Sequence, residues 1–460
     1  MPAGGASFAG MMRAQLSPGH DLPGGVVFFE RLSRRPNGSP ERARLQDCRM
    51  NVTLIIFILV YVAMAFGKLP GLRVDRTGAA VVGTLAMIVF GAISPKAAWE
   101  AVDYRTLGML FGLMVVSTAF VVSGFYAWLA QRVATMPVSP PVLLAILIVV
   151  GGVLAAVLTK DVVMVAMTPL LVSITMARKL NPVPFLLAFC FGVNTGSVGM
   201  ISGSPQNMIV AQGLGLSFSG FIRVAALPAL LSFPVVWAVV AFMYRGRWAL
   251  PAGQDAPPSQ ADASPPLDRW ETIKAALVTL AVMAAFISGH WPREIIALTA
   301  AGVLLLNRKI ASKDMLGHVD GNLLLLIMGL FVVNAALDLT GLPQQWLHDL
   351  RNAGVDLNDP LTLCLVGGLL SNVIGNNPTV MLLTPFLQPG ADADALGAAL
   401  AVGTGFFSNL VVFGSLAGII VVEQAARCGV RVSFMEFSRA GAPVTVACLA
   451  IALAWITYLT

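Results

Sequence analysis

The chain has 460 residues, of which 57% are hydrophobic and only 11% are charged, and its mean hydropathy is +0.81. Soluble domains carry about 25% charged residues, so the composition excludes an ordinary soluble protein. The net charge of +6 does not indicate a nucleic-acid partner, because basic residues of membrane proteins gather in cytoplasmic loops. Five cysteines without CxxC spacing and four scattered histidines favour neither a disulfide framework nor a metal centre.

The first 49 residues differ from the rest of the chain, because they are rich in Arg, Gly and Pro and contain no adequate signal-peptide core. We expect 1–49 to be a disordered tail, and Met50 is an alternative start of translation. Apolar runs of membrane-spanning length then recur along the chain. They begin near Val52, Gly78, Leu107, Val142, Pro184, Phe221, Ile273, Ile295, Leu323, Leu361, Gly397 and Ala440.

Polar markers repeat between the two halves of the chain at a nearly constant spacing. Asp103 and Ser123-Gly124 match Asp320 and Thr340-Gly341 at an offset of 217 residues, together with a Gly-Leu-x-Val-Val stretch between them. A Pro- and Ala-rich stretch without helical periodicity separates the halves. The sequence therefore predicts repeat one at 51–245, a cytoplasmic linker at 246–270 and repeat two at 271–460.

Each repeat is expected to contain three spanning helices, a re-entrant hairpin, a spanning helix broken in its middle and a last spanning helix. Five crossings is an odd number, so the second repeat must enter the membrane upside down. The predicted fold is an all-α polytopic membrane protein of two inverted repeats, each with about five transmembrane helices and one re-entrant hairpin. With the linker in the cytoplasm, most Lys and Arg residues from Met50 onward lie on the cytoplasmic side, as positive-inside membrane proteins require. The exceptions are Lys96, Arg105, Arg223, Arg293 and Arg351.

The first hairpin tip is predicted at Thr159-Lys160-Asp161, between two apolar arms. Lys and Asp are costly in hydrocarbon, so they should pair or face a polar cavity. Asp161 is also a candidate N-cap of the second arm. The alternative is that this turn lies at the membrane interface between two complete spans.

The second tip is predicted at Ser371-Asn372, Asn376-Asn377 and Thr379. Within it, Asn376-Asn377 align with Lys160-Asp161 of the first tip at an offset of 216. The preceding arm is too short to cross the bilayer. Asn377 before Pro378 is typical of a helix start, whose N–H dipoles suit an anion. Amide oxygens also suit a dehydrated Na⁺, so a sodium site is expected near Ser371, Asn372, Asn376 and Gly414.

Two otherwise apolar helices contain polar interruptions, which are tolerated at membrane depth only where they line a cavity or are buried in protein. The alternative is that Gly and Ser at these positions merely permit close helix packing. The interruptions contribute further candidate binding residues, namely Asn194, Gly203, Ser204 and Asn207 in repeat one, and Asn409, Gly414 and Ser415 in repeat two.

These segments resemble the arsenite-permease/citrate-transporter superfamily, which includes divalent anion:sodium symporters. The resemblance rests on Lys160-Asp161, Thr168-Pro169, Asn181-Pro182-Val183-Pro184, Gly203-Ser204-Pro205-Gln206-Asn207, the 371–378 stretch and Thr384-Pro385, and it covers about 51–460. It implies an elevator-type carrier in a bacterial inner membrane, no resident cofactor, Na⁺ or H⁺ as coupling ion, and the capacity to form a homodimer. Superfamily members usually have Asn-Asp at the first tip. We therefore hypothesise that Lys160 replaces a coupling cation or binds the substrate anion directly, and that transport is sodium-independent or proton-coupled there.

The leading functional prediction is a secondary active transporter of a small anion, either a carboxylate or an oxyanion. The first alternative is a sodium/proton antiporter, for which Asp161 is the best titrating candidate, while Asp338 and Glu423 resemble helix-boundary residues. An intramembrane enzyme is the remote alternative, since the sequence contains no HExxH and no buried Ser/His pair. No GxxxxGK[ST] loop is present either, which excludes a self-contained ATP-driven pump.

Overall fold

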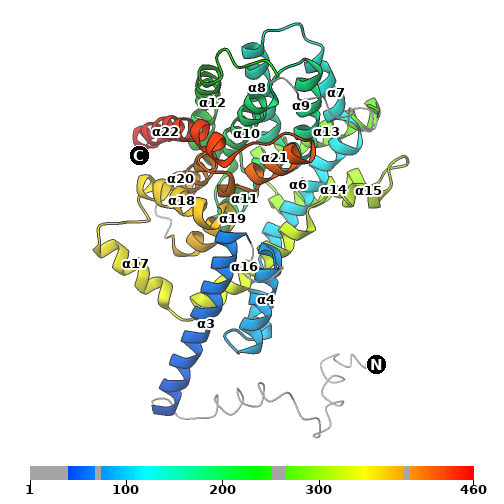
Figure 1. The fold of residues 1–460 in the computed structure, drawn as a ribbon. Coiled ribbons are helices and arrows are strands. Elements are labelled where there is room, and N and C mark those ends of the chain that lie inside the picture. Colours follow the sequence, from blue (N-terminus) through cyan, green and yellow to red (C-terminus); the bar gives the residue numbers. More distant parts are fainter. Residues whose placement is uncertain (1–39, 68–73, 251–265, 388–392, 460) are drawn as a thin grey trace, which may run out of the picture.

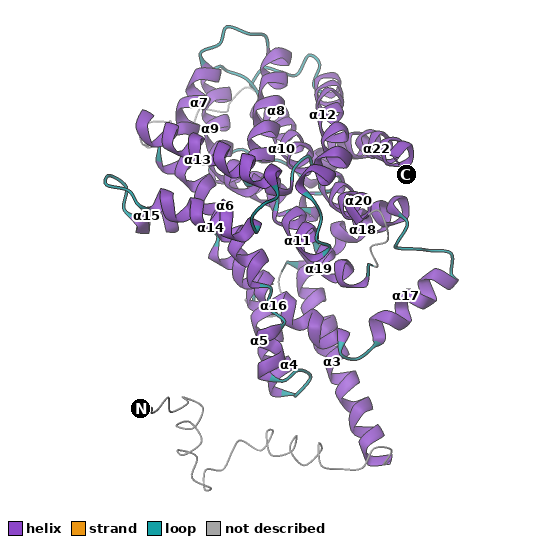
Figure 2. Ribbon diagram, turned by 180° about the vertical axis from the view of Figure 1, so that it is seen from behind, coloured by secondary structure: helices purple, strands orange, loops and turns teal. Residues whose placement is uncertain are grey.

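The computed structural model describes residues 40–67, 74–250, 266–387 and 393–459, with side chains from residue 49 onward. The described residues form helices and no strand longer than an isolated bridge (Figures 1 and 2). Eight described helices are long and apolar enough to span a membrane, and four shorter helices are apolar as well. The all-α polytopic prediction is confirmed, and each of the twelve expected apolar runs lies within a helix.

The first half of the chain contains three long or apolar helices, a helical hairpin, an interrupted helix and a final long helix. The elements are α3 (Pro40–Phe66), α4 (Arg76–Val89), α5 (Pro95–Glu100), α6 (Tyr104–Val122), α7 (Phe125–Ala134), the hairpin α8 (Pro140–Val157) and α9 (Lys160–Ala177), the interrupted pair α10 (Pro182–Val198) and α11 (Pro205–Gly213) joined by η2 (Ile201–Gly203), and α12 (Phe218–Met243).

The second half has its elements in the same order. They are α13 (Arg269–Ser288), α14 (Arg293–Leu305), α15 (Ser312–Leu316), α16 (Gly321–Asp338), α17 (Leu342–Asn352), the hairpin α18 (Pro360–Ile374) and α19 (Asn376–Leu383) with η4 (Thr384–Phe386), the interrupted pair α20 (Ala393–Phe407) and α21 (Leu416–Arg427) joined by η5 (Val412–Gly414), and α22 (Phe434–Leu459). The short helices α5, α7, α15 and α17 were not predicted, and the inverted orientation of the halves stays a prediction.

The N-terminal boundary of the first helix differs from the expected one. Helix α3 begins at Pro40 instead of residue 51, because the residues before Met50 include good helix formers that extend the apolar helix toward its N-terminus. Proline is well tolerated at a first helical position, where its missing N–H costs nothing. The rest of the expected tail, 1–39, lies outside the described residues, as do residues 251–265 of the predicted linker.

The C-terminal end of the predicted linker is well anchored. Asp268 caps α13 by accepting hydrogen bonds from the N–H groups of Trp270 and Glu271. Lys309 Nζ lies 2.8 Å from a carboxylate oxygen of Asp268, and this hydrogen bond lowers the pKa of the Asp268 carboxyl. The contact joins the start of α13 to the turn after α14.

Small residues allow helices from the two halves to pack closely. A Cβ at Gly112 of α6 would lie 2.5 Å from the carbonyl carbon of Ala297 in α14, and one at Gly329 of α16 would lie 3.0 Å from that of Ala80 in α4. Gly112 and Gly329 are separated by the 217-residue offset, and so are Ala80 and Ala297. Each contact therefore pairs a glycine of one half with an alanine of the other half, and the two contacts use equivalent residues. Small residues permit such close approach at membrane-helix interfaces.

The hairpins and interrupted helices form the other part of the molecule. Helix α8 packs against α10, and α18 packs against α20, while α12 lies beside α22. In Figure 1 these helices occupy the upper part of the view, whereas α3, α4 and α16 extend below them. All seventeen residues of α10 are buried, and Phe191 of α10 packs edge-on against Phe437 of α22. The core of this part is therefore centred on α10 and α20.

Candidate functional site: a polar cavity between two hairpin tips

The tip of the first hairpin is buried in the protein. Thr159 is the N-cap residue of α9, and both its backbone N–H and its hydroxyl lie within hydrogen-bond distance of Ser117 Oγ in α6, at 3.0 and 3.1 Å. Lys160 is 2% exposed and Asp161 is 9% exposed. The expected N-cap role of Asp161 is wrong: Asp161 lies in the first turn of α9, because the chain already becomes helical at Lys160.

The tip of the second hairpin turns at Gly375, whose φ of 93° favours glycine. Gly375 occupies the N-cap position of α19. The predicted cap at Asn377 is therefore wrong, since the glycine turn starts the helix two residues earlier. As a consequence the amide side chains of Asn376 and Asn377 are not used as caps, and the Oδ1 atom of each is buried without a hydrogen-bond partner.

The first interrupted helix restarts where the sequence predicted, at Ser204-Pro205. A Cβ at Gly203 would lie 2.2 Å from the carbonyl oxygen of Ser197, so the break requires glycine there. Asn207 holds the loop by donating from Nδ2 to the carbonyl oxygens of Ser197 and Met200, at 2.9 and 2.8 Å. Both Asn207 Oδ1 and Ser204 Oγ are buried without a partner.

The second interrupted helix restarts at Ser415, which accepts a hydrogen bond from Gly418 N at 3.0 Å and thereby caps α21. A Cβ at Gly414 would lie 2.4 Å from Asn372 Oδ1, so glycine permits the hairpin side chain to approach the break. Asn194 in α10 and Asn409 in the turn after α20 are joined directly by a hydrogen bond of 3.0 Å.

One glutamine connects the two tips. Gln206, in the first turn of α11, accepts hydrogen bonds at Oε1 from Lys160 Nζ at 3.2 Å and from Asn376 Nδ2 at 3.3 Å. Asn376 Nδ2 also lies 2.8 Å from Ser408 Oγ. Residues from both hairpins and both interrupted helices therefore meet at one place in the interior. Gln206 and Ser408 belong to the polar stretches of the sequence but were not predicted as site residues.

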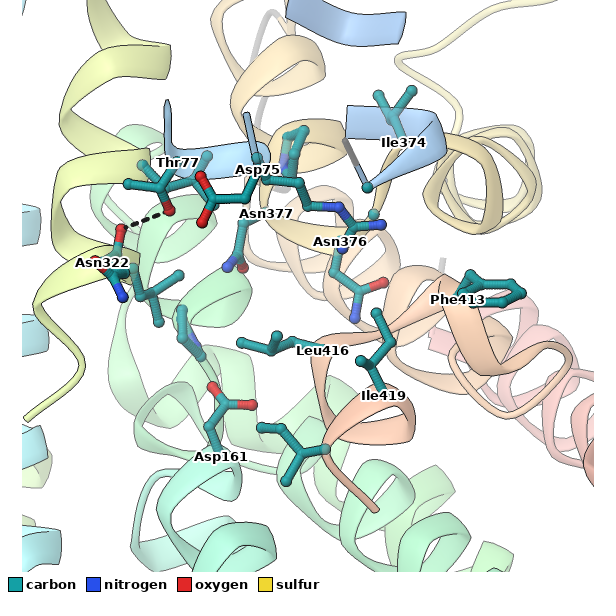
Figure 3. Close-up of a pocket in the computed structure, with 18 of the residues that line it drawn as sticks. Asp75, Thr77, Asp161, Asn322, Ile374, Asn376, Asn377, Phe413, Leu416 and Ile419 are labelled. Atoms are coloured by element: carbon teal, nitrogen blue, oxygen red, sulfur yellow. Dashed lines mark hydrogen bonds between the residues drawn. The ribbon is translucent and has the colours of Figure 1, made fainter. Parts of the chain in front are cut away.

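A cavity of about 1110 Å³ extends from these tips to the ends of α3, α4 and α16. In Figure 3, Asp161 lies on one side of it, and Asn376 and Asn377 lie on the opposite side with their amides directed toward the same space. Its polar and charged lining residues are Asp75, Arg76, Thr77, Lys160, Asp161, Gln206, Asp320, Asn322, Asn372, Asn376, Asn377 and Glu423.

The lining separates into an exposed acidic rim and a buried inner end. Asp75, Asp320 and Glu423 are exposed, and the first two cap α4 and α16 through hydrogen bonds to backbone N–H groups. Lys160 and Gln206 belong to the buried end. Glu423 was expected at a helix boundary, but it lies within α21 and lines the cavity. The rim was not predicted from the sequence, because an Asp at a helix start indicates a helix cap and does not indicate that the residue lines a cavity.

The predicted site residues divide into two groups. Lys160, Asp161, Asn372, Asn376 and Asn377 line the cavity. The others do not line the cavity and are buried in the protein: Thr159, Asn194, Gly203, Ser204, Asn207, Ser371, Thr379, Asn409, Gly414 and Ser415. Within the hairpin, Ser371 donates to Gly368 O and Thr379 donates to Gly375 O.

The expected sodium position has suitable oxygen atoms. Asn372 Oδ1 and Asn376 Oδ1 are buried without partners, and amide oxygens are the type of ligand that a hard cation prefers. Ser371 is less available, because its hydroxyl donates to Gly368 O at 2.7 Å. The described residues contain no cluster of His, Cys, Asp and Glu that could hold a metal ion. A sodium ion at the second tip stays a prediction.

Helices of membrane-spanning length around a cavity that leads from an exposed rim to two buried hairpin tips place this protein in the class of integral-membrane transporters. A model of the citrate transporter family, CitMHS, matches residues 61–403, and the chain belongs to this family. The 46 kDa membrane protein of Mycobacterium leprae (strain TN) is 30% identical over 431 residues, which cover 89% of this chain and 99% of that protein.

Two further comparisons agree with this assignment. The silicon efflux transporter LSI3 of Oryza sativa subsp. japonica is 26% identical over 443 residues, covering 81% of this chain and 90% of the relative. The crystal structure of the Alcanivorax borkumensis YdaH transporter has a similar fold, with a TM-score of 0.56, 15% identity, and coverage of 90% of this chain and 98% of that one. The family is one of transporters, and the rice relative is named as a transporter, so the enzyme alternative is set aside.

Proposed function

We propose that the protein is a secondary active transporter that carries a small anion, a carboxylate or an oxyanion, across a bacterial inner membrane. The observation that carries this proposal is the buried ammonium of Lys160 at the inner end of the cavity. Its hydrogen-bond partner is the neutral amide of Gln206. Among the described residues, no carboxylate oxygen lies within 4.0 Å of Lys160 Nζ. Asp161, the next residue, is the acidic side chain that interacts with this ammonium, but it does not pair with it directly. A buried charge that is not directly paired is costly, and a bound anion would offset that cost.

The polar atoms around Lys160 support an anion with oxygen acceptors. Gln206, whose Oε1 contacts the ammonium, also carries a buried donor without a partner at Nε2. The acidic rim opposes anion entry, but its carboxylates are exposed and screened by solvent and salt. The inner end therefore dominates binding, and the rim moderates the rate of entry.

An elevator-type movement of the tips is the second part of the proposal. Ser117 of α6 holds the tip of the first hairpin at Thr159. Asn334 of α16 is equivalent to Ser117 at the 217-residue offset, and its Nδ2 atom is buried without a partner. The second tip, at Gly375 and Asn376, lines the cavity instead. This asymmetry fits a transporter that alternates between two states. In the present state the first tip contacts Ser117, and in the other state the second tip would contact Asn334. In the predicted orientation, with the linker cytoplasmic, the cavity described here faces the cytoplasm.

A sodium/proton antiporter is the second candidate, because Asp161 Oδ1 is buried in the same cavity without a hydrogen-bond partner.

The first experiment is thermal unfolding of the purified protein with citrate, succinate, phosphate and sulfate as choline or sodium salts, since a ligand selective for the folded state raises Tm. We expect one anion class to raise Tm in choline salts, and Lys160→Gln to remove that shift while the surface variant Lys313→Gln retains it. Stabilisation by Na⁺ alone, with no effect of any anion, would instead favour antiport.

A homodimer stays a prediction, which the mass of the detergent-solubilised protein would test.

A further inference from the structure

Gln206 is held in a single orientation by its neighbours. The Lys160 ammonium has only donors, so the glutamine must present its oxygen to it. Oε1 also accepts from Asn376, and the two contacts measure 3.2 and 3.3 Å. These two contacts leave Nε2 as the remaining donor group of the amide. It is buried without a partner although Gln206 is only 1% exposed and lines the cavity. An unpaired buried donor is unfavourable, so a ligand oxygen that accepted from this N–H would relieve that cost.

The interrupted helix does not require glutamine at this position. Gly203-Ser204 and Gly414-Ser415 precede the restarted helices of the two halves at an offset of 211. At this offset Ala417 is the residue of the second half that is equivalent to Gln206. Ala417 is fully buried in the first turn of α21, and Ser415 caps that helix without help from a polar neighbour. The fold of the break is therefore compatible with an apolar residue, and the amide in the first half needs another explanation.

We propose that Gln206 is a specificity-determining residue that binds the anion together with Lys160. The Nε2 group of Gln206 and the ammonium of Lys160 donate to oxygens of the same carboxylate or oxyanion group. Because Oε1 keeps its contact with Asn376, the bound anion is linked through one side chain to the second hairpin tip. The inference rests on the proposed anion transport and adds the residue that selects for an oxygen acceptor.

The test compares anion binding to the purified full-length protein with that of Gln206 variants, using the anion that stabilises the parent protein in choline salts. Gln206→Leu is expected to weaken binding about tenfold or more, since it removes a hydrogen bond to a charged group. Gln206→Glu is expected to abolish binding, because the introduced carboxylate would form an ion pair with the Lys160 ammonium and compete with the anion. Gln206→Asn retains the amide and should bind between the parent and the leucine variant. Gln212→Leu, on the same helix but outside the cavity lining, is the matched control and should bind like the parent.

The outcomes separate this inference from the proposed function. If the parent binds an anion and both Gln206→Leu and Gln206→Glu bind it within twofold of the parent, Gln206 is not a binding residue, although anion transport stands. If the parent protein binds none of the four anions, both proposals are overturned. Should Gln206→Leu fail to give folded protein by size-exclusion chromatography, the comparison of Gln206→Asn and Gln206→Glu with the Gln212 control decides in the same way.

Discussion

Asn194 of α10 donates a hydrogen bond from Nδ2 to Oδ1 of Asn409, in the turn that follows α20, at 3.0 Å, although 215 residues separate them. Both side chains are completely buried. The two asparagines match at the 215-residue offset; Asn194 lies within α10, and Asn409 lies just beyond the end of α20. The two broken helices therefore meet at equivalent residues, next to the loops that form the inner end of the cavity.

The first prediction concerns this pair. Asn194→Ala leaves an asparagine oxygen unpaired in the core and should destabilise the protein by about 1–3 kcal/mol. Asn409→Ala should have a similar effect, and the double variant should cost less than the sum because no unpaired amide remains. Thermal unfolding of the four proteins in detergent measures the coupling. Strictly additive effects would mean that the hydrogen bond contributes nothing to stability.

The second prediction concerns the close contact between α6 and α14. Gly112→Ala should strongly destabilise the protein, because the new methyl group would lie 2.5 Å from the backbone of Ala297. Gly329→Ala should be milder, since its Cβ would lie 3.0 Å from the backbone of Ala80. Gly302→Ala in α14 is the control: its Cβ meets nothing within 4 Å, and alanine is favoured over glycine in a helix by about 0.5–1 kcal/mol. Equal Tm values for all three variants would contradict the packing described here.

The third prediction tests the exchange of the hairpin tips. Ser117 Oγ and Thr159 Oγ1 are 3.1 Å apart, so cysteines at these positions in a cysteine-free background should form a disulfide. This cross-link should stop transport, and reduction should restore it, because the first tip must leave Ser117 in each cycle. Cysteines at Asn334 and Asn376 should cross-link only when a transported anion is supplied to the protein in proteoliposomes. Full transport by the oxidised Ser117/Thr159 pair would show that the first tip does not move.

The fourth prediction concerns Lys160 as a built-in cation. Uptake by the parent protein in proteoliposomes should not depend on Na⁺. In Lys160→Asn, uptake should gain a sodium dependence of about tenfold, in the range of ordinary coupling between two ligands. Equal and full sodium dependence in the parent and in the variant would contradict the hypothesis. Replacement of the exposed Lys313 by Asn should leave the sodium response unchanged.

The sequence alone determined the membrane class, the positions of the apolar helices and the polar interruptions. Hydrophobic runs of bilayer length and local signals such as Ser204-Pro205 act over a few residues, so they can be recognised without a fold. Helix starts were less certain: Gly375, not Asn377, begins α19, because a positive-φ turn overrides the Asn-Pro signal.

Only the tertiary structure decided which polar residues face the cavity. Lys160, Gln206 and Asn376 lie far apart in the sequence and meet because two hairpins and two broken helices converge. The rim residues Asp75 and Asp320 are ordinary helix caps by sequence, and their place at the cavity depends on how α4 packs against α16. Long-range packing of this kind is not visible in the local residue pattern. A buried polar atom without a partner, such as Gln206 Nε2, can likewise be recognised only when all of its neighbours are known.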